Sequence, residues 1–121
     1  MPAHRHAIAI KRAYAAPDED DGYRILVDRL WPRGLGKDAA HVDLWLKEIA
    51  PSPALRVWFG HDPARFAEFR RRYDAELKSN TAAVAQMDRI LAQTPVTLVY
   101  AAKDETHNHA IVLKNFLESR R

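Results

Sequence analysis

The sequence predicts a small α/β domain in which helices flank a short, mostly parallel sheet of about three strands, giving three layers. Two β-branched runs, at 23–30 and 96–102, are separated by a long stretch of helical pattern. Such a separation is typical of parallel strands joined by a crossover. With 121 residues and 47% hydrophobic content, the chain has enough material for one core, so we expect a single domain over residues 1–121.

Three segments are predicted to be strands. The first is the alternating run Ala7–Ile10. The second, 23–30, is preceded by an acidic loop and is stopped by the proline and glycine of segment 28–34. The third, 96–102, is the longest β-branched run and should lie at the centre of the sheet.

Two helices are predicted in the middle of the chain. Apolar residues at helical spacing over 42–49 predict the first, which Pro51 ends. Ser52 is suited to cap a second, very short helix, with Pro53 in its first position and Gly60 at its exit.

Three longer helical patterns follow. Asp62 and the proline after it open a helix with one apolar face, formed by Phe66, Phe69, Tyr73 and Leu77. Thr81–Gln93 predicts a further helix that turns Val84, Met87 and Leu91 inward. The last helix begins near Thr106 or His107 and carries the stripe His109, Val112, Leu113, Phe116 and Leu117.

Polar residues follow both long strands. If 23–30 and 96–102 are parallel neighbours, segments 28–34 and 103–109 emerge at the same carboxyl edge, where ligands bind in open α/β sheets. Arg29, Arg33 and Lys103 would bind an anion there. Trp31 either offers its ring to a ligand or belongs to the core.

Two histidines and two carboxylates are candidates for proton transfer. His109 lies on the apolar stripe and would be a general acid or base if Asp28 or Asp104 holds it, with His107 as the alternative. Structural roles are also open, because Asp104 or Thr106 could cap the last helix. Asp28 could likewise pair with its neighbour Arg29. On a helix the two histidines point apart, so we expect no metal site.

Several functional classes are disfavoured. The chain has no cysteine, which excludes thiol chemistry and disulfides. Its formal net charge of +3 is spread along the sequence and no basic recognition helix stands out, so sequence-specific DNA binding is not expected. Phosphate-loop, nucleophile-elbow and zinc-protease motifs do not occur. Without a secretory signal or membrane-spanning run, the expected location is the cytoplasm.

The chain resembles bacterial YeaO-like proteins, which belong to domain-of-unknown-function family 488 (DUF488). The resemblance rests on 22–34, Trp45–Pro51, Trp58–Pro63 and Lys103–Ala110, in this order. It implies a small cytoplasmic α/β protein and assigns no catalytic residue. The resemblance also implies that other branches of the family carry cysteines around the segment that matches 101–109. This chain has no cysteine, so a thiol mechanism is not expected here.

Two functions are therefore considered. The first is an enzyme acting on a small anionic substrate, phosphorylated or nucleotide-like, at the carboxyl edge of the sheet. The second is a non-catalytic module that binds a nucleotide, a nucleic acid or a protein. The sequence names no cofactor. Because a sheet of few strands leaves exposed edges, a homodimer is also expected.

Overall fold

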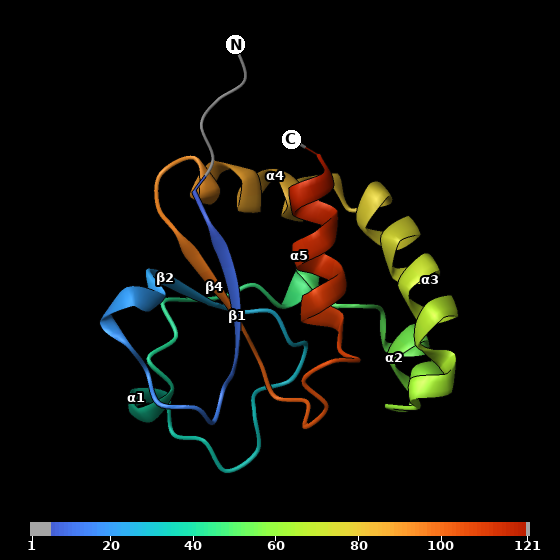
Figure 1. Cartoon of the computed structure of the whole chain (residues 1–121), viewed down its shortest axis with the longest axis horizontal. Helices are drawn as coiled ribbons and strands as arrows, with labels where there is room; N and C mark the ends of the chain where they lie inside the picture. Colours follow the sequence, from blue (N-terminus) through green and yellow to red (C-terminus); the bar gives the residue numbers. More distant parts are fainter. Residues whose placement is uncertain (1–5, 121) are drawn as a thin grey trace.

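The computed structural model describes residues 6–120 and contains a four-stranded, all-parallel sheet (Figure 1). The strands are β1 (Ile8–Arg12), β2 (Tyr23–Leu26), β3 (Leu44–Trp45) and β4 (Val96–Tyr100), in the order β1-β4-β2-β3. All three pairings are parallel, and β4 occupies an inner position as predicted. The additional strand, β3, is only two residues long and lies at an edge.

Helices surround this sheet. They are α1 (Lys37–Ala40), α2 (Pro53–Phe59), α3 (Phe66–Ser79), α4 (Thr81–Leu91) and α5 (His109–Ser119), with 3-10 turns at Glu19–Asp21, Lys47–Ile49 and Pro63–Arg65. Helix α5 packs on the strands and α3 packs on α5 (Figure 1). No helix within residues 6–120 is long and apolar enough to cross a membrane.

The capping signals that predicted α2 are confirmed. The Ser52 hydroxyl oxygen accepts the N–H of Leu55 at 3.2 Å, Pro53 is the first helical residue, and Gly60 ends the helix with a left-handed φ of 54°. Glu76 of α3 accepts hydrogen bonds from both the N–H and the hydroxyl of Ser52. This contact fixes the start of α2 against α3.

The helix predicted over 42–49 is wrong. The chain there forms β3 and a 3-10 turn, because its backbone pairs with the free edge of β2. Asp43 and Leu46 donate their N–H groups to the carbonyls of Arg24 and Leu26, and the Asp43 carboxylate accepts the N–H of Arg24. The spacing of apolar residues alone could not show whether the backbone hydrogen bonds of this segment are made to β2 or within a helix.

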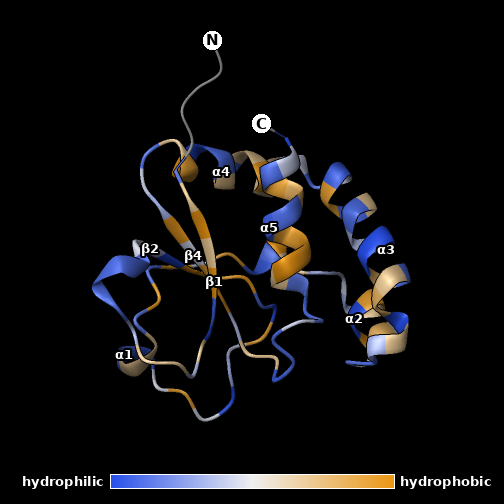
Figure 2. Cartoon of the chain, in the orientation of Figure 1, coloured by the Kyte–Doolittle hydropathy of each residue, from blue (hydrophilic) through white to orange (hydrophobic). Residues whose placement is uncertain are grey.

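Strand residues alternate between two apolar clusters. On one face, Ile25, Val27, Leu98 and Tyr100 join the main core with α3, α4 and α5. On the other, Leu26 and Val99 pack with Trp31, Leu35 and Val42. Figure 2 shows the hydrophobic strands and α5 beside the largely hydrophilic outer side of α3.

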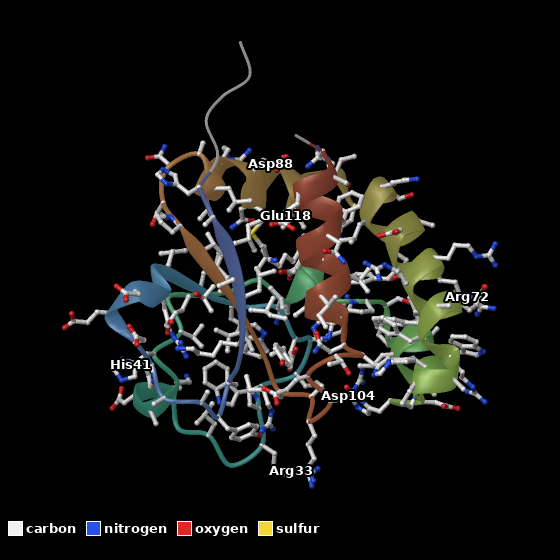
Figure 3. The ribbon with its side chains drawn as sticks, in the orientation of Figure 1. Arg33, His41, Arg72, Asp88, Asp104 and Glu118 are labelled. Atoms are coloured by element: carbon white, nitrogen blue, oxygen red, sulfur yellow. The ribbon has the colours of Figure 1, made fainter. Side chains whose placement is uncertain are left out.

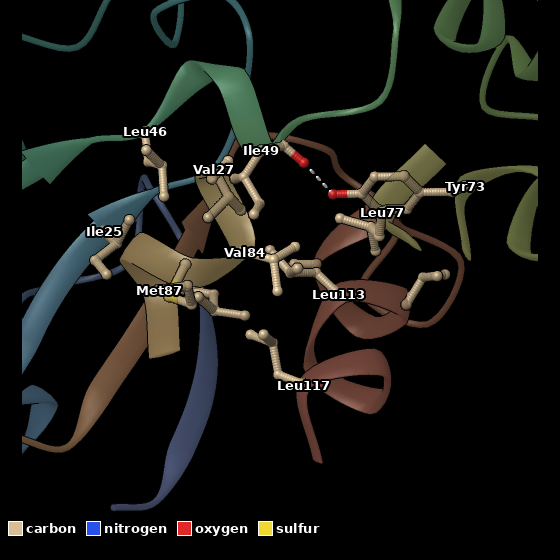
Figure 4. Packing of buried hydrophobic residues seen from close by; sticks show 14 of the residues in the cluster. Ile25, Val27, Leu46, Ile49, Tyr73, Leu77, Val84, Met87, Leu113 and Leu117 are labelled. Carbon is tan, nitrogen blue, oxygen red and sulfur yellow. Dashed lines mark hydrogen bonds between the residues drawn. The ribbon is translucent and has the colours of Figure 1, made fainter. Parts of the chain in front are cut away.

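Tyr73 anchors α3 inside the main core. Its hydroxyl donates to the carbonyl oxygen of Ile49 at 2.6 Å, and its ring lies beside Leu77 in the same packed cluster as Val84 and Leu113 (Figure 4). The tyrosine is fully buried, so this bond satisfies a hydroxyl that has lost contact with water.

Candidate functional site

The two polar segments predicted to meet at the carboxyl edge do lie together. Strands β2 and β4 are parallel neighbours, and the Asp28 carboxylate accepts the N–H of Ala101 through Oδ2 at 2.9 Å. A cavity of about 660 Å³ opens between these two segments and α2. We call it the carboxyl-edge cavity; its lining residues include Asp28–Arg33, Pro51, Arg56, Phe59, His61, Phe69, Ala101–Asp104, Asn108 and His109.

Asp28 and His109 form the inner polar part of the cavity wall. The Nε2 atom of His109 lies 2.9 Å from Asp28 Oδ1 and 3.1 Å from the carbonyl oxygen of Val27. Both side chains are mostly buried, with 16% and 15% of their surfaces exposed for His109 and Asp28. Because two oxygen acceptors face Nε2, we assign the proton to this nitrogen, which leaves Nδ1 as the acceptor of the neutral ring.

Asp104 and His107 form a second pair, in the loop before α5. His107 Nδ1 lies 3.0 Å from Asp104 Oδ2, and the Oδ1 atom accepts the N–H groups of Thr106 and His107, each at 2.9 Å. The N–H of Thr106, aided by its hydroxyl and by His107, lowers the pKa of Asp104 to about 2. The His107 ring packs edge-on against Phe66, and His107 does not line the cavity.

Asn108, rather than Asp104 or Thr106, caps α5. Its side-chain oxygen accepts the N–H of Ile111 at 3.0 Å, and its side-chain nitrogen donates to the Asp104 carbonyl at 2.9 Å. Asn108 is buried and lines the cavity. The cap fixes His109 as the first helical residue and therefore sets the position of its ring.

Arg29 and Trp31 both line the cavity and both brace its wall. The Arg29 guanidinium donates to the carbonyls of Ala50 and Pro51, at 3.2 and 3.3 Å, and forms no ion pair with Asp28. The Trp31 indole N–H donates to the carbonyl oxygen of Leu35 at 2.7 Å. The ring of Trp31 packs against the second apolar cluster, so it has core contacts as well as a place at the cavity.

Arg33 and Lys103 are the exposed cations of the two segments. Neither side chain forms a salt bridge or a hydrogen bond with residues 6–120. Only the Arg33 backbone is held, because its carbonyl accepts the Tyr14 hydroxyl at 2.7 Å. Figure 3 shows the Arg33 side chain extending outward from its loop and Asp104 nearby at the same edge.

The sequence did not identify two further basic residues of the cavity, Arg56 on α2 and His61 just after it. Arg56 is exposed and its side chain has no ion-pair partner among the described residues. His61 has a left-handed φ of 57°, which is uncommon outside glycine and turns the chain directly after Gly60. The positive φ itself has no sequence signal other than the preceding glycine.

Potential metal ligands are not clustered in the described part of the chain. Within residues 6–120, no group of three or more histidine, aspartate or glutamate side chains is arranged to hold a metal ion. His107 and His109 instead each face one carboxylate, and the basic side chains are distributed around the opening.

Comparisons with known proteins give one consistent result. The family model described as "Inactive DUF488-N3 subclade" matches residues 7–121. The uncharacterised protein YeaO of Escherichia coli (strain K12) is 46% identical over 112 residues, which covers 93% of this chain and 97% of that protein. An uncharacterised protein of Mycobacterium tuberculosis (strain ATCC 25618 / H37Rv) is 42% identical, covering 93% and 95% of the two chains. No solved structure matches the chain.

Proposed function

Because the chain belongs to the DUF488 family and matches a subclade described as inactive, we propose that it is a non-catalytic module that binds a small organic anion in the carboxyl-edge cavity. The observation that carries this proposal is a set of basic side chains gathered around one cavity from three separate segments. They are Arg29, Arg33, Arg56 and Lys103. A concave site lined by charge of one sign concentrates ligands of the opposite sign.

The carboxylates of the cavity cancel only part of this charge. Asp28 and Asp104 line it too, but they stand against the four cations Arg29, Arg33, Arg56 and Lys103. Arg33, Arg56 and Lys103 have no carboxylate partner in the described part of the chain. A bound phosphate or carboxylate would therefore provide these cations with their counter-charge.

The size and walls of the cavity suit a small molecule. A volume of about 660 Å³ lies within the usual range of small-molecule sites, roughly 300 to 1,000 Å³. Trp31, Phe59 and Phe69 contribute aromatic surface to the walls. Planar apolar groups pack well on such surfaces, so an organic anion fits better than an inorganic one.

Thermal unfolding in the presence of organic phosphates and carboxylates tests the proposal. A ligand at 100 times its Kd adds about 2.7 kcal/mol to the free energy of unfolding. For a chain of this size the melting temperature should rise by roughly 10 °C. Arg56→Gln and Lys103→Gln should each weaken the binding of that ligand by about tenfold, as measured by calorimetry, because each removes a charge-assisted contact.

Arg71→Gln is the matched control. Arg71 is an exposed arginine of α3 that pairs with Glu68 and does not line the cavity. Its removal should leave the affinity unchanged within twofold. The proposal fails if no anion raises the melting temperature, or if Arg56→Gln and Lys103→Gln bind as tightly as the wild type.

A second candidate function is acid–base catalysis on the same ligand. It is favoured by one observation: the Val27 carbonyl orients the Nε2–H of His109, with the Asp28 carboxylate beside it, which leaves Nδ1 as an available base. Each ligand found in the screen would be incubated with the protein and followed by NMR. Turnover that His109→Gln abolishes without loss of binding would favour the enzyme. An unchanged bound ligand would favour the binding module.

We also keep a homodimer as a proposal. Strands β1 and β3 lie at the two edges of the sheet, and exposed edges are often covered by a second subunit. Light scattering of the purified protein measures its mass in solution directly. A mass of 13.8 kDa at all concentrations would exclude the dimer.

A further inference from the structure

The carboxyl-edge cavity contains a buried acceptor that no donor satisfies. Among the side-chain atoms of residues 6–120, Asp28 Oδ1 is buried and has no hydrogen-bond partner. The other oxygen of this carboxylate, Oδ2, is occupied by the N–H of Ala101. Most buried polar atoms in proteins are paired, so an unpaired carboxylate oxygen on a side chain that lines a cavity indicates a place for a donor, which reaches Oδ1 by displacing the groups that cover it.

His109 does not fill this place, although its Nε2 lies 2.9 Å from Oδ1. The single N–H on that nitrogen is directed at the Val27 carbonyl, 3.1 Å away, and not along the line to Oδ1. One N–H cannot make two well-directed hydrogen bonds at once. Asp28 is thus held close to the imidazole while one of its oxygens can still accept a hydrogen bond.

The same ring contributes a second acceptor. With the proton on Nε2, the Nδ1 atom of neutral His109 has a lone pair, and it forms no hydrogen bond with the described residues. Asp28 and His109 both line the cavity. Two neighbouring acceptors select a ligand group that carries N–H or O–H donors and disfavour a ligand group that only accepts.

The unpaired cations lie further out. Asp28 and His109 are mostly buried, whereas Arg33, Arg56 and Lys103 are exposed. Aromatic side chains of the cavity, including Phe59 and Phe69, are buried as well. A ligand that matches this arrangement has a donor and a planar ring at its inner end and an anionic group at its outer end.

We infer that the ligand is an amphoteric molecule of this kind, and this inference rests on the proposed function. Its amino-bearing heteroaromatic ring donates to Asp28 and His109, and its phosphate contacts the outer cations. Nucleoside monophosphates whose base has an exocyclic amino group have this composition. Inorganic phosphate lacks the ring and its donors, and a nucleoside without phosphate lacks the anion.

Calorimetry with two matched pairs of nucleotides tests this inference. The pairs are adenosine 5′-monophosphate with purine riboside 5′-monophosphate, and cytidine 5′-monophosphate with its 2-pyrimidinone analogue. In each pair the second compound lacks only the amino group. The amino compound should bind at least about tenfold more tightly in at least one pair, because its loss leaves a charged acceptor unpaired.

The protein variant Asp28→Asn should reduce this ratio to less than about threefold, because the amide no longer presents a charged acceptor. His109→Gln is the second variant, used if Asp28→Asn does not fold as judged by circular dichroism, and it should also reduce the ratio. Arg56→Gln should weaken both members of a pair equally and leave the ratio unchanged.

The outcomes separate the two proposals. Equal affinity within both pairs overturns the donor-end inference and leaves anion binding in place. If neither pair binds while other organic anions raise the melting temperature, the inference is likewise overturned and the proposed function stands. If no organic anion binds at all, both are wrong.

Discussion

At the scale of single residues, Asp104 shows how one side chain shapes the loop that precedes α5. Its Oδ1 atom accepts the N–H of Thr106 and of His107 at 2.9 Å, and the Thr106 hydroxyl at 3.0 Å. The ionised carboxylate makes these bonds, so they lower the pKa of Asp104 to about 2, against an ordinary value of 3.8. The loop conformation that presents Lys103 and His109 to the cavity thus depends on a charged Asp104.

This pKa shift predicts a pH dependence of stability. The folded protein binds the Asp104 proton less readily than the unfolded chain, so the stabilisation is complete above pH 3.8 and is lost as the pH falls toward 2. Urea unfolding of the wild type and of Asp104→Asn should show a difference that is largest near pH 6 and that shrinks toward pH 2. A constant difference, or an Asp104 carboxyl signal that titrates near 3.8 by NMR, would contradict the prediction.

At the scale of secondary-structure elements, a buried ion-pair network joins β1, β2 and α1. Arg24, which is 4% exposed, pairs with Asp21 and donates to the carbonyls of Ala40 and His41. Lys11 of β1 pairs with the same Asp21 at 2.8 Å. The network closes the face of the sheet opposite the main helices, where the second apolar cluster is small.

Removing Asp21 should therefore destabilise the fold strongly. Asp21→Ala leaves the buried guanidinium of Arg24 without its counter-charge, which typically costs about 3 kcal/mol of the free energy of unfolding. Glu68→Ala is the control, because Glu68 also pairs with arginines but does so on the exposed side of α3. Denaturant unfolding should show a much smaller loss for this control. Similar losses for both variants would mean that burial of Arg24 contributes little.

The elements that were predicted correctly are those with local signals. Ser52 and Gly60 delimit α2 by bonds and backbone angles within the helix itself. Segment 42–49 has no such caps, and its backbone partners are carbonyls of β2, some twenty residues earlier in the chain. Asn108 caps α5, whereas the sequence had suggested Asp104 or Thr106. All three residue types can cap a helix, so the sequence alone could not choose between them.

At the scale of the whole molecule, the candidate site illustrates the same division. Parallel pairing of β2 with β4 brings Asp28 close to His109. The sequence predicted this meeting, because two parallel neighbouring strands end at the same edge of the sheet. Arg56 was not found because α2 reaches the cavity only through its packing on α3, which Ser52 and Glu76 fix. Such contacts between distant segments have no pattern in a single sequence.

The distribution of charge over the molecule predicts how strongly its binding to nucleic acid depends on salt. The net charge of +3 is small, and the exposed arginines of α3 are partly neutralised, because Glu68 pairs with both Arg71 and Arg72. A nucleic-acid backbone that binds at the carboxyl-edge cavity would contact Arg33, Arg56 and Lys103. Three phosphate contacts give a slope of about −2.7 for log K against log salt, compared with −5 to −9 for six to ten contacts.

Fluorescence anisotropy with a labelled DNA duplex measures this slope. We expect weak binding that disappears near 150 mM salt, whereas a small anion in the cavity should stay bound, because aromatic walls add to its charge contacts. The Arg56→Gln variant should flatten the duplex slope by about 1, and Arg71→Gln should leave it unchanged. Sub-micromolar duplex binding at 150 mM salt with a slope steeper than about −5 would require a basic surface beyond the cavity, and would favour a nucleic-acid module over a small-molecule one.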